Sequence, residues 1–224
     1  MMLSSATVPN LLCRVVWILA LLTPGLWAVW LVALPENHAC AAASVNAPTA
    51  QHRVYLPLVL RACASVELIQ DGGFEAGLPN SAWQTSSNVG SDVLDDTPDP
   101  SPHSGTWKVW LGGDDLVQES LWQIINVPPG TVRLQVSYWW QVSTLESLHP
   151  FDTLRVQVRD ANGNLLEELE TLTDGDAAAN WQQSVFTITV DAGQTIQLAF
   201  VAETDTTNPT NFFVDDVSVR RICP

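Results

Sequence analysis

The segment Asn211–Val219, NFFVDDVSV, lies near the C-terminus and indicates the fold that this chain is expected to adopt. Successive side chains of a β-strand point to opposite faces, so Phe213, Asp215 and Val217 are predicted to share one face. An unpaired carboxylate among apolar side chains is costly, and Asp215 therefore needs a partner. The chain offers few cations, which favours a metal ion, and further ligands are expected in Asp71–Glu75, DGGFE.

Short runs with alternating apolar residues follow one another from residue 63 onward and are separated by turn sequences. No segment shows a capped helical stripe, so we expect an all-β, antiparallel two-sheet jelly-roll sandwich after an N-terminal signal or anchor segment. Asn162-Gly163 predicts a type I′ hairpin, and Val66–Gln70 is expected beside Phe212–Val219. The runs are Val66–Gln70, Trp107–Leu111, Leu116–Val127, Val132–Val142, Thr153–Arg159, Leu165–Leu169, Trp181–Val190, Thr195–Ala202 and Asn211–Val219.

The composition is strongly acidic. Nine Lys and Arg residues stand against 24 Asp and Glu residues, which gives a formal net charge of −15. The only charged residues before position 44 are Arg14 and Glu36, so the rest of the chain carries this net charge. Such a surface repels phosphate backbones and anionic lipid headgroups, and we expect no nucleic-acid partner.

The N-terminal part is expected to be a targeting segment (residues 1–43) and a linker (44–62) before the globular domain (63–224). Val15–Leu34 is an apolar run long enough to cross a bilayer, which takes about 20 residues. A cleavable signal peptide would end at Ala41-Ala42-Ala43. The alternative is an uncleaved anchor, which would be the chain's only membrane contact. Both alternatives predict a secreted or cell-surface protein.

The cysteines suit an exported protein. Of the four, Cys13 lies in the leader, while Cys63 and Cys223 bracket the expected domain. We therefore predict a Cys63–Cys223 disulfide that joins the two ends of the domain, which leaves Cys40 unpaired if it is retained. The absence of a CxxC pair argues against a zinc or thiol-redox site.

A series of short motifs runs through the domain in order. They are Gly72-Gly73-Phe74-Glu75, Trp83, His103-Ser104-Gly105, Trp107, Trp110-Leu111-Gly112-Gly113, Gln123, Val127-Pro128, Phe151-Asp152, Trp181, Ala192-Gly193 and Phe213-Val214-Asp215-Asp216-Val217. Together they resemble the galactose-binding-like jelly rolls of secreted bacterial proteins, which include carbohydrate-binding modules. The resemblance spans residues 65–220 and is more specific for the fold than for a ligand.

The resemblance also implies a structural calcium ion between the first and last strands. Its ligands here would be the Gly73 carbonyl, the Glu75 carboxylate, a carbonyl near Thr106, and Asp215. All-oxygen coordination fits calcium. The alternative is that Glu75 and Asp215 only accept hydrogen bonds from backbone N–H groups of loops.

An outward-facing set of side chains is the expected ligand site. Alternation along Val132–Gln141 turns Gln135 and Trp139 away from the apolar face, and the expected neighbouring strand turns Arg155 and Gln157 the same way. A tryptophan ring stacks on sugar C–H faces, while amide and guanidinium groups bond hydroxyls. The alternative is that a loop covers Trp139. Two other tryptophans, Trp122 and Trp181, are expected in the core.

Enzymatic chemistry lacks support in the sequence. The chain contains no G-x-S-x-G, HExxH or phosphate-cradling glycine loop. The expected function is therefore a non-catalytic extracellular carbohydrate-binding module with a structural calcium and a polysaccharide or glycan partner. The alternative is a cell-surface protein-interaction or adhesion module that binds no glycan.

Overall fold

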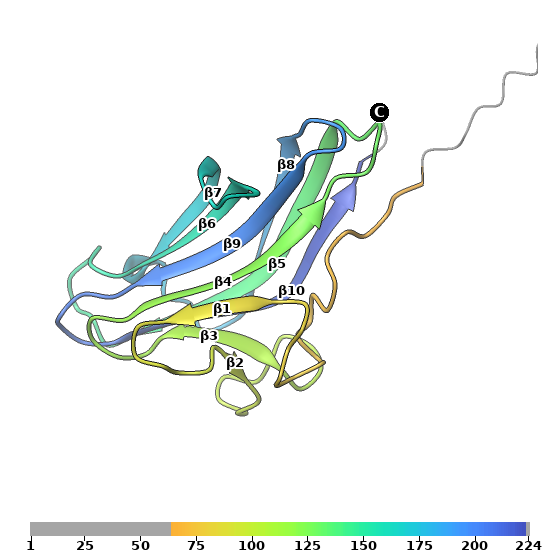
Figure 1. The fold of residues 1–224 in the computed structure, drawn as a ribbon. Coiled ribbons are helices and arrows are strands. Elements are labelled where there is room, and N and C mark those ends of the chain that lie inside the picture. Colours follow the sequence, from red (N-terminus) through yellow and green to blue (C-terminus); the bar gives the residue numbers. More distant parts are fainter. Residues whose placement is uncertain (1–63, 223–224) are drawn as a thin grey trace, which may run out of the picture. The chain divides into compact units, whose positions relative to one another are not determined.

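The computed structural model describes residues 64–222, which form two antiparallel five-stranded sheets (Figure 1). The predicted all-β antiparallel sandwich is confirmed. The first sheet has the order β1–β4–β9–β6–β7, and the second has the order β2–β3–β10–β5–β8. The strands are β1 Gln84–Ser87, β2 Leu94–Asp95, β3 Lys108–Gly112, β4 Gln118–Asn126, β5 Arg133–Thr144, β6 Thr153–Asp160, β7 Leu165–Thr173, β8 Gln182–Thr189, β9 Thr195–Glu203 and β10 Thr210–Arg221, with one 3₁₀ turn, Asp174–Asp176, between β7 and β8.

Eight of the nine predicted runs coincide with strands β3 to β10, whereas the short strands β1 and β2 were not expected. The ninth run, Val66–Gln70, lies beside the end of β10 as predicted. The Leu68 amide donates to the Val219 carbonyl at 2.8 Å, and the Arg221 amide donates to the Val66 carbonyl at 3.0 Å. The proposed Cys63–Cys223 disulfide and the targeting and linker segments lie outside the described residues.

The alternation predicted for β10 is wrong in its second half. The register shifts between Asp215 and Ser218, where Asp216 has a φ of 47°. A bulge of this kind adds a residue and reverses the faces beyond it. Val214 before the bulge and Val217 after it therefore both belong to the core, while Phe213 and Asp215 lie on the other side of the strand. Asp215 and Val217 do not share a face.

The core lies between the two sheets, and Tyr138 of β5 is its largest fully buried side chain. Its ring meets Phe200 of β9 edge-on, with centroids 5.2 Å apart, and its hydroxyl donates to Glu170 of β7 at 2.5 Å. The Ser184 hydroxyl of β8 donates to the same carboxylate at 2.8 Å. Burial and the neighbouring carboxylate raise the pKa of Tyr138, which keeps the hydroxyl a donor. Glu170 thus ties the edge of the first sheet to the second.

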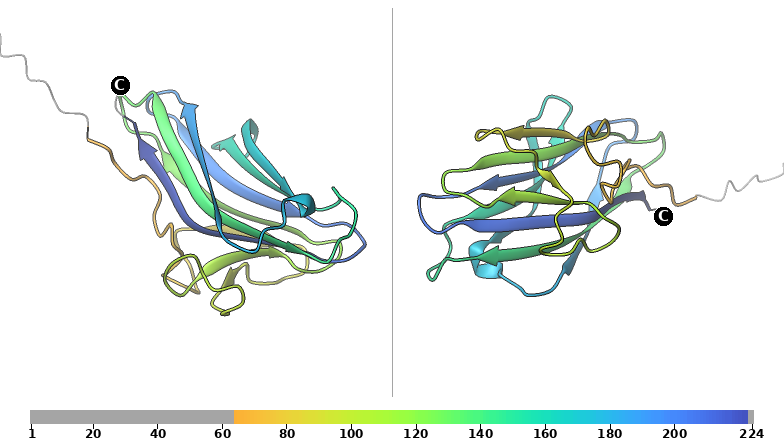
Figure 2. Two further views of the ribbon diagram at one scale, coloured as in Figure 1. Left: turned by 180° about the vertical axis from the view of Figure 1, so that it is seen from behind. Right: turned by 90° about the horizontal axis from the view of Figure 1, so that it is seen from below.

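Two connections between strands show which neighbours in the chain pair within a sheet and which lie in different sheets. The β6–β7 hairpin predicted at Asn162-Gly163 is confirmed, with the Asp160 amide donating to the Asn164 carbonyl at 2.8 Å. It is not type I′, because that turn needs positive φ at both central residues and only Gly163 (φ 87°) has it. The β5–β6 connection, residues 145–152, instead passes from the second sheet to the first, and Figure 2 shows the two sheets as separate layers.

No helix within residues 64–222 is both long and apolar enough to cross a membrane.

Candidate functional site

The outward face of the first sheet, which we call the polar face, is built from alternate residues of five paired strands. Alternation follows burial on β4, where Leu121 and Gln123 are buried while Trp122 between them is half-buried and points outward. The strand registers place Trp122 in a row that also contains an amide on each side of it. From β1 to β7 that row is Gln84, Trp122, Ala199, Gln157 and Glu168, and the next is Ser86, Ser120, Val201, Arg155 and Thr171.

A hydrogen-bond network along β6 holds the polar groups of this face in place. The Arg155 guanidinium donates to Glu203 at 2.9 Å, and Arg159 donates through two nitrogens to the Gln157 side-chain oxygen at 3.0 and 2.8 Å. The Gln157 amide donates in turn to Glu168 at 3.3 Å. Burial lowers the pKa of Arg159. Planar groups held in this way have less rotamer freedom to lose in any contact with a ligand.

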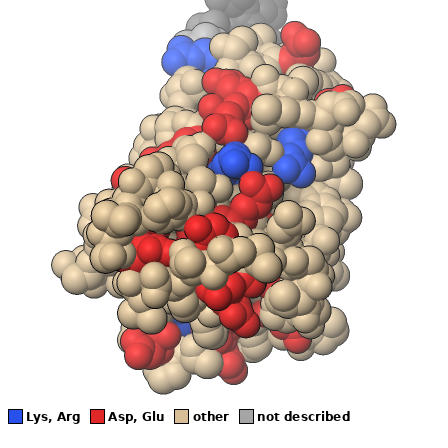
Figure 3. Space-filling model, turned by 90° about the vertical axis from the view of Figure 1, so that its left-hand side faces the viewer, with Lys and Arg blue, Asp and Glu red and all other residues tan. Residues whose placement is uncertain are grey.

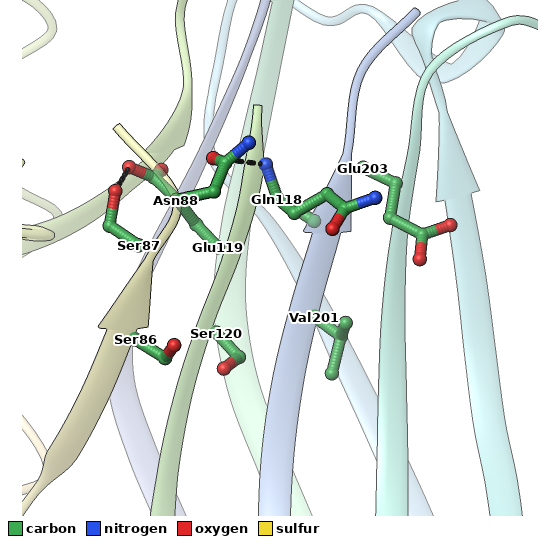
Figure 4. Close-up of a pocket in the computed structure, with 9 residues that line it drawn as sticks. Ser86, Ser87, Asn88, Gln118, Glu119, Ser120, Val201 and Glu203 are labelled. Carbon is green, nitrogen blue, oxygen red and sulfur yellow. Dashed lines mark hydrogen bonds between the residues drawn. The ribbon is translucent and has the colours of Figure 1, made fainter. Parts of the chain in front are cut away.

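A depression of about 280 Å³ opens on the polar face next to this network. Figure 4 shows Ser86, Ser120 and Val201 along successive strands, with the Gln118 amide and the Glu203 carboxylate beyond them. Asn88 fixes one wall, since its side-chain oxygen accepts from the backbone N–H of Gln118 at 2.8 Å. The lining is therefore mainly hydroxyl, amide and carboxylate groups, which suit a hydroxyl-rich ligand.

Acidic groups dominate the surface. Figure 3 shows one side of the molecule, where the few Lys and Arg atoms lie among more numerous acidic ones. On the polar face, Arg155 and Glu203 form an ion pair with side chains 35% and 46% exposed, which in general contributes only about 0–1 kcal/mol to stability. The pair with Glu203 engages Nη1 of Arg155, and the other N–H groups of the guanidinium remain as hydrogen-bond donors.

The four ligand residues predicted from sequence do not share one face, and this prediction is wrong. Gln135 and Trp139 lie on β5 in the second sheet, whereas Arg155 and Gln157 lie on β6 in the first. The two strands are consecutive in the chain, but their connection crosses between the sheets. Outward residues of the two strands therefore point to opposite sides of the sandwich.

Trp139 is partly covered by a loop, as the alternative reading anticipated. The His103 imidazole stacks on its ring with centroids 3.9 Å apart and planes at 16°, and Trp181 meets the same imidazole edge-on at 6.0 Å. Asp216 holds the imidazole through a 2.6 Å contact to Nδ1. One face of the Trp139 ring is therefore unavailable for stacking on a sugar.

Gln135, by contrast, lines an open depression of about 360 Å³ on the outward side of the second sheet, together with Ser137, Gln183, Val185, Ser218 and Arg220. Among these residues Arg220 already donates to Glu67 at 3.0 Å. None of the six lining side chains is aromatic, so this depression offers no stacking platform.

The segments predicted to hold calcium do converge. Glu75 accepts from the amides of Thr106 and Trp107 at 2.8 and 3.0 Å, and a Cβ on Gly105 would fall 2.1 Å from its oxygen. A Cβ on Gly73 would lie 3.3 Å from Asp216 Oδ1. The DGGFE motif, the loop at residues 103–107 and the β10 bulge thus form one cluster, which we call the bulge cluster.

Asp215 is the buried carboxylate of the bulge cluster. Its oxygens accept from the amides of Ser104 at 3.0 Å and Asp216 at 2.7 Å. Burial raises its pKa to about 6, and the neighbouring Asp216 adds to the effect. Within residues 64–222 no three His, Cys, Asp or Glu side chains are placed to hold a metal ion. The residues fit calcium only if carbonyls such as those of Gly73 and Thr106 complete the ligand set.

Solved structures show the same architecture. The module TmCBM61, solved in complex with beta-1,4-galactotriose, is 20% identical, with a TM-score of 0.54, and the match covers 70% of this chain and 99% of that one. The fold is a β-sandwich of the carbohydrate-binding-module type. A family 16 carbohydrate-binding module (18% identity, TM-score 0.46, 68% of this chain and 98% of that one) and the K1 adhesin domain of Lys-gingipain from Porphyromonas gingivalis W83 (18%, 0.47, 72% and 100%) are more distant matches. No family model and no curated protein matches this sequence.

Sequence reasoning missed Trp122, which it assigned to the core. The strand reads QESLWQIIN, and the buried polar residues Glu119 and Gln123 obscure an alternation in which the odd-numbered positions face inward. Glu119 is buried because its oxygens accept from the Ser87 hydroxyl and the Gly112 amide. The signal in the sequence was the alternation of the apolar residues: Leu121 and Ile125 lie an even number of positions apart and share the inward face, so Trp122 falls on the outward face. The prediction for Trp122 is corrected accordingly.

Proposed function

We propose that this chain is a non-catalytic, extracellular carbohydrate-binding module whose ligand lies on the polar face of the first sheet. The observation that carries the proposal is the placement of Trp122 in one row with Gln157, next to Arg155 and the hydroxyl-lined depression. Stacking on the indole would supply apolar contact with a pyranose ring, while the amide and guanidinium groups would bond its hydroxyls.

The polar face is preferred over the region around Trp139 because it places the outward ring of Trp122 near the Arg155 and Gln157 side chains, which hydrogen bonds hold in place. On the second sheet the Trp139 ring is stacked against His103. Two of the residues predicted from sequence, Arg155 and Gln157, remain part of the proposed site, whereas Gln135 and Trp139 do not.

The expected ligand is a neutral, extended polysaccharide or glycan. Glu203 and Glu168 flank the proposed contacts, and the chain carries a net charge of −15, which would repel a polyanion. A shallow depression that crosses paired strands suits several successive sugar units better than one enclosed monosaccharide.

The test is binding of the full chain, as recovered from expressing cells, to an array of neutral and acidic glycans, followed by calorimetry on the best ligand. Trp122→Ala should abolish binding and leave the melting temperature within a few degrees. Trp110→Ala is the matched control, since Trp110 is also outward-facing and 38% exposed but lies on β3 of the other sheet. Equal binding by the two variants would refute the proposed site.

A structural calcium ion in the bulge cluster is a separate proposal. It would be held by Glu75 and Asp215 with the carbonyls of Gly73 and Thr106. The ion would compensate the negative charge of the Asp215 carboxylate, which burial otherwise disfavours. Calcium bound only to the folded state raises the melting temperature. If calcium and chelator give the same melting temperature for the wild-type chain, the proposal is wrong.

One observation favours the alternative of a protein-interaction module. The β5–β6 loop exposes three large apolar side chains, Leu145, Leu148 and Phe151, at 73%, 69% and 49%. Exposed apolar groups clustered in one loop are typical of contact surfaces. An array on which no glycan binds the wild-type chain would favour this reading, and a Leu145→Ser/Leu148→Ser variant would then be expected to lose attachment to cell surfaces.

A further inference from the structure

Strand β8, Gln182–Thr189, is an edge of the second sheet that has no visible protection. Its sequence, QQSVFTIT, contains no charged residue, proline or glycine over eight residues. Among the described residues its backbone pairs only with β5. Its outward side chains are exposed, and Val185 is 53% exposed. A free edge with these properties is a template for another strand.

The other three edges are protected in recognised ways. Strands β1 and β2 have only four and two residues. Strand β7 has nine residues, but it carries Glu167, Glu168 and Glu170 and shows two register shifts in its pairing with β6. Short length, charge and bulges are the usual means by which proteins block edge-to-edge pairing. The contrast singles out β8.

We infer that β8 pairs in antiparallel fashion with β8 of a second copy of this chain, which joins the two second sheets into one continuous sheet. A two-fold axis perpendicular to the sheet keeps the outward faces of both copies on the same side. Centred on Val185 or Phe186, the pairing sets only uncharged residues opposite one another, among them Val185 against Val185 or Thr187 of the second copy. Like charges, which destabilise cross-strand pairs, are avoided throughout the strand.

Self-complementarity is the argument for a second copy: in a two-fold antiparallel pairing, the uncharged strand β8 meets only its own uncharged residues. The chain has a net charge of −15, so two copies that approach through most of their surface repel each other. Strand β8 is a long segment through which they can meet without opposing carboxylates. Pairing there would also cover the partly exposed Phe186, which packs against Tyr138 with ring centroids 6.3 Å apart.

The polar face stays free in such a dimer, because β8 belongs to the second sheet and the polar face to the first. A dimer would therefore present two polar faces. If the proposed function is correct, a repeating polysaccharide would be bound by both faces, and binding would gain from effective concentration. The dimer itself does not depend on that function.

The test is sedimentation velocity of the full chain, as recovered from expressing cells, over a hundredfold range of protein concentration. We expect a monomer–dimer equilibrium that Val185→Lys shifts at least tenfold toward monomer, because the two lysines would lie directly opposite or diagonally across the two-fold axis in either register. Val89→Lys is the matched control: Val89 is 55% exposed in a loop, and this variant should dimerise like the wild type. Thermal melts of both variants establish that each is folded.

A second measurement locates the contact. In a Val185→Cys chain mixed with a Thr187→Cys chain, oxidation should give a dimer whose cross-linked peptides, identified by mass spectrometry, both come from β8. A wild-type chain that stays monomeric throughout, a Val185→Lys variant that dimerises unchanged, or a disulfide from β8 to Cys63 of the same chain, which follows the apolar segment at residues 54–60, would each overturn the inference.

Discussion

Asn in place of Asp215 tests the electrostatics of the bulge cluster directly. Asp215 is fully buried, and its pKa of about 6 in the folded state compares with about 3.9 for an unfolded chain. A carboxyl group whose folded pKa is raised contributes stability that is fully present below the unfolded value and is lost as pH rises through the folded value. Two pKa units at 1.36 kcal/mol each make this loss about 2–3 kcal/mol between pH 4 and pH 7.

The assay is urea unfolding of the wild type and of Asp215→Asn at pH 4 to 7 in a chelator. The free energy of unfolding of the wild type, minus that of the variant, should fall by about 2–3 kcal/mol across this range. The subtraction removes the titrating groups that do not interact with Asp215, as well as the constant cost of losing one backbone acceptor.

Two other carboxylates act with the opposite sign, at the lower end of this window and below it. Burial opposes ionisation of Glu67 and Asp95, but hydrogen bonds from Ser218 and Arg220 to the first and from Lys108 to the second outweigh it, and both pKa values lie below the ordinary range. Their contributions are present above about pH 4 and are lost at lower pH.

A difference curve that stays flat from pH 4 to pH 7 would refute the reasoning about Asp215. Excess calcium gives a further result: if the ion binds, it stabilises the ionised carboxylate, and the slope should shrink or vanish. A slope that calcium does not change would leave Asp215 a buried, hydrogen-bonded carboxylate without a cation.

Three further substitutions probe the sandwich. Trp139→Ala should lower the free energy of unfolding by about 2 kcal/mol, because the His103 imidazole that stacks on the ring loses this contact. Glycan binding should remain intact, and a variant that loses binding at unchanged stability would contradict this. Glu170→Gln weakens the acceptor for Tyr138 and should cost about 1–3 kcal/mol in urea unfolding, which an unchanged midpoint would exclude. Lys108 is fully buried and pairs with Asp95, so Lys108→Met leaves that carboxylate without its cation and should lower the free energy of unfolding by about 3 kcal/mol. The double variant Lys108→Met/Asp95→Asn should recover part of this loss.

Strand positions were predictable because alternation and turn residues are local properties. The segment at residues 132–142 became β5 and the segment at residues 195–202 became β9, since each alternates apolar residues over a length that suits a strand. The prediction that Val66–Gln70 lies beside β10 was also correct. Strands β1 and β2 were missed because residues 84–95 are mainly polar and only Val93 and Leu94 are buried there.

The bulge in β10 was beyond the reach of alternation. A two-residue period gives no indication that Asp216 adopts a positive φ, and one extra residue exchanges the faces of everything after it. The glycines of the DGGFE segment indicated that the backbone of another strand approaches closely there. A Cβ on Gly72 would fall 1.9 Å from the Val217 carbonyl, so the DGGFE segment packs directly against the bulge. The cluster was correctly located, although the faces of its strand were not.

Only half of the proposed ligand site was predictable from the sequence, and the reason lies in the connections between strands. Whether two consecutive strands pair or cross between sheets depends on the loop that joins them, and residues 145–152 carry no tight-turn sequence that would decide it. Outward side chains on β5 and β6 therefore looked like one face, although the first strand places Trp139 under His103 and the second places Gln157 in one row with Trp122. Side-chain type pointed to tryptophan, arginine and glutamine, which are also the groups of the proposed site. Only the pairing of β6 with β9, and of β9 with β4, brings the accessible tryptophan and the fixed amide to the same side of the molecule.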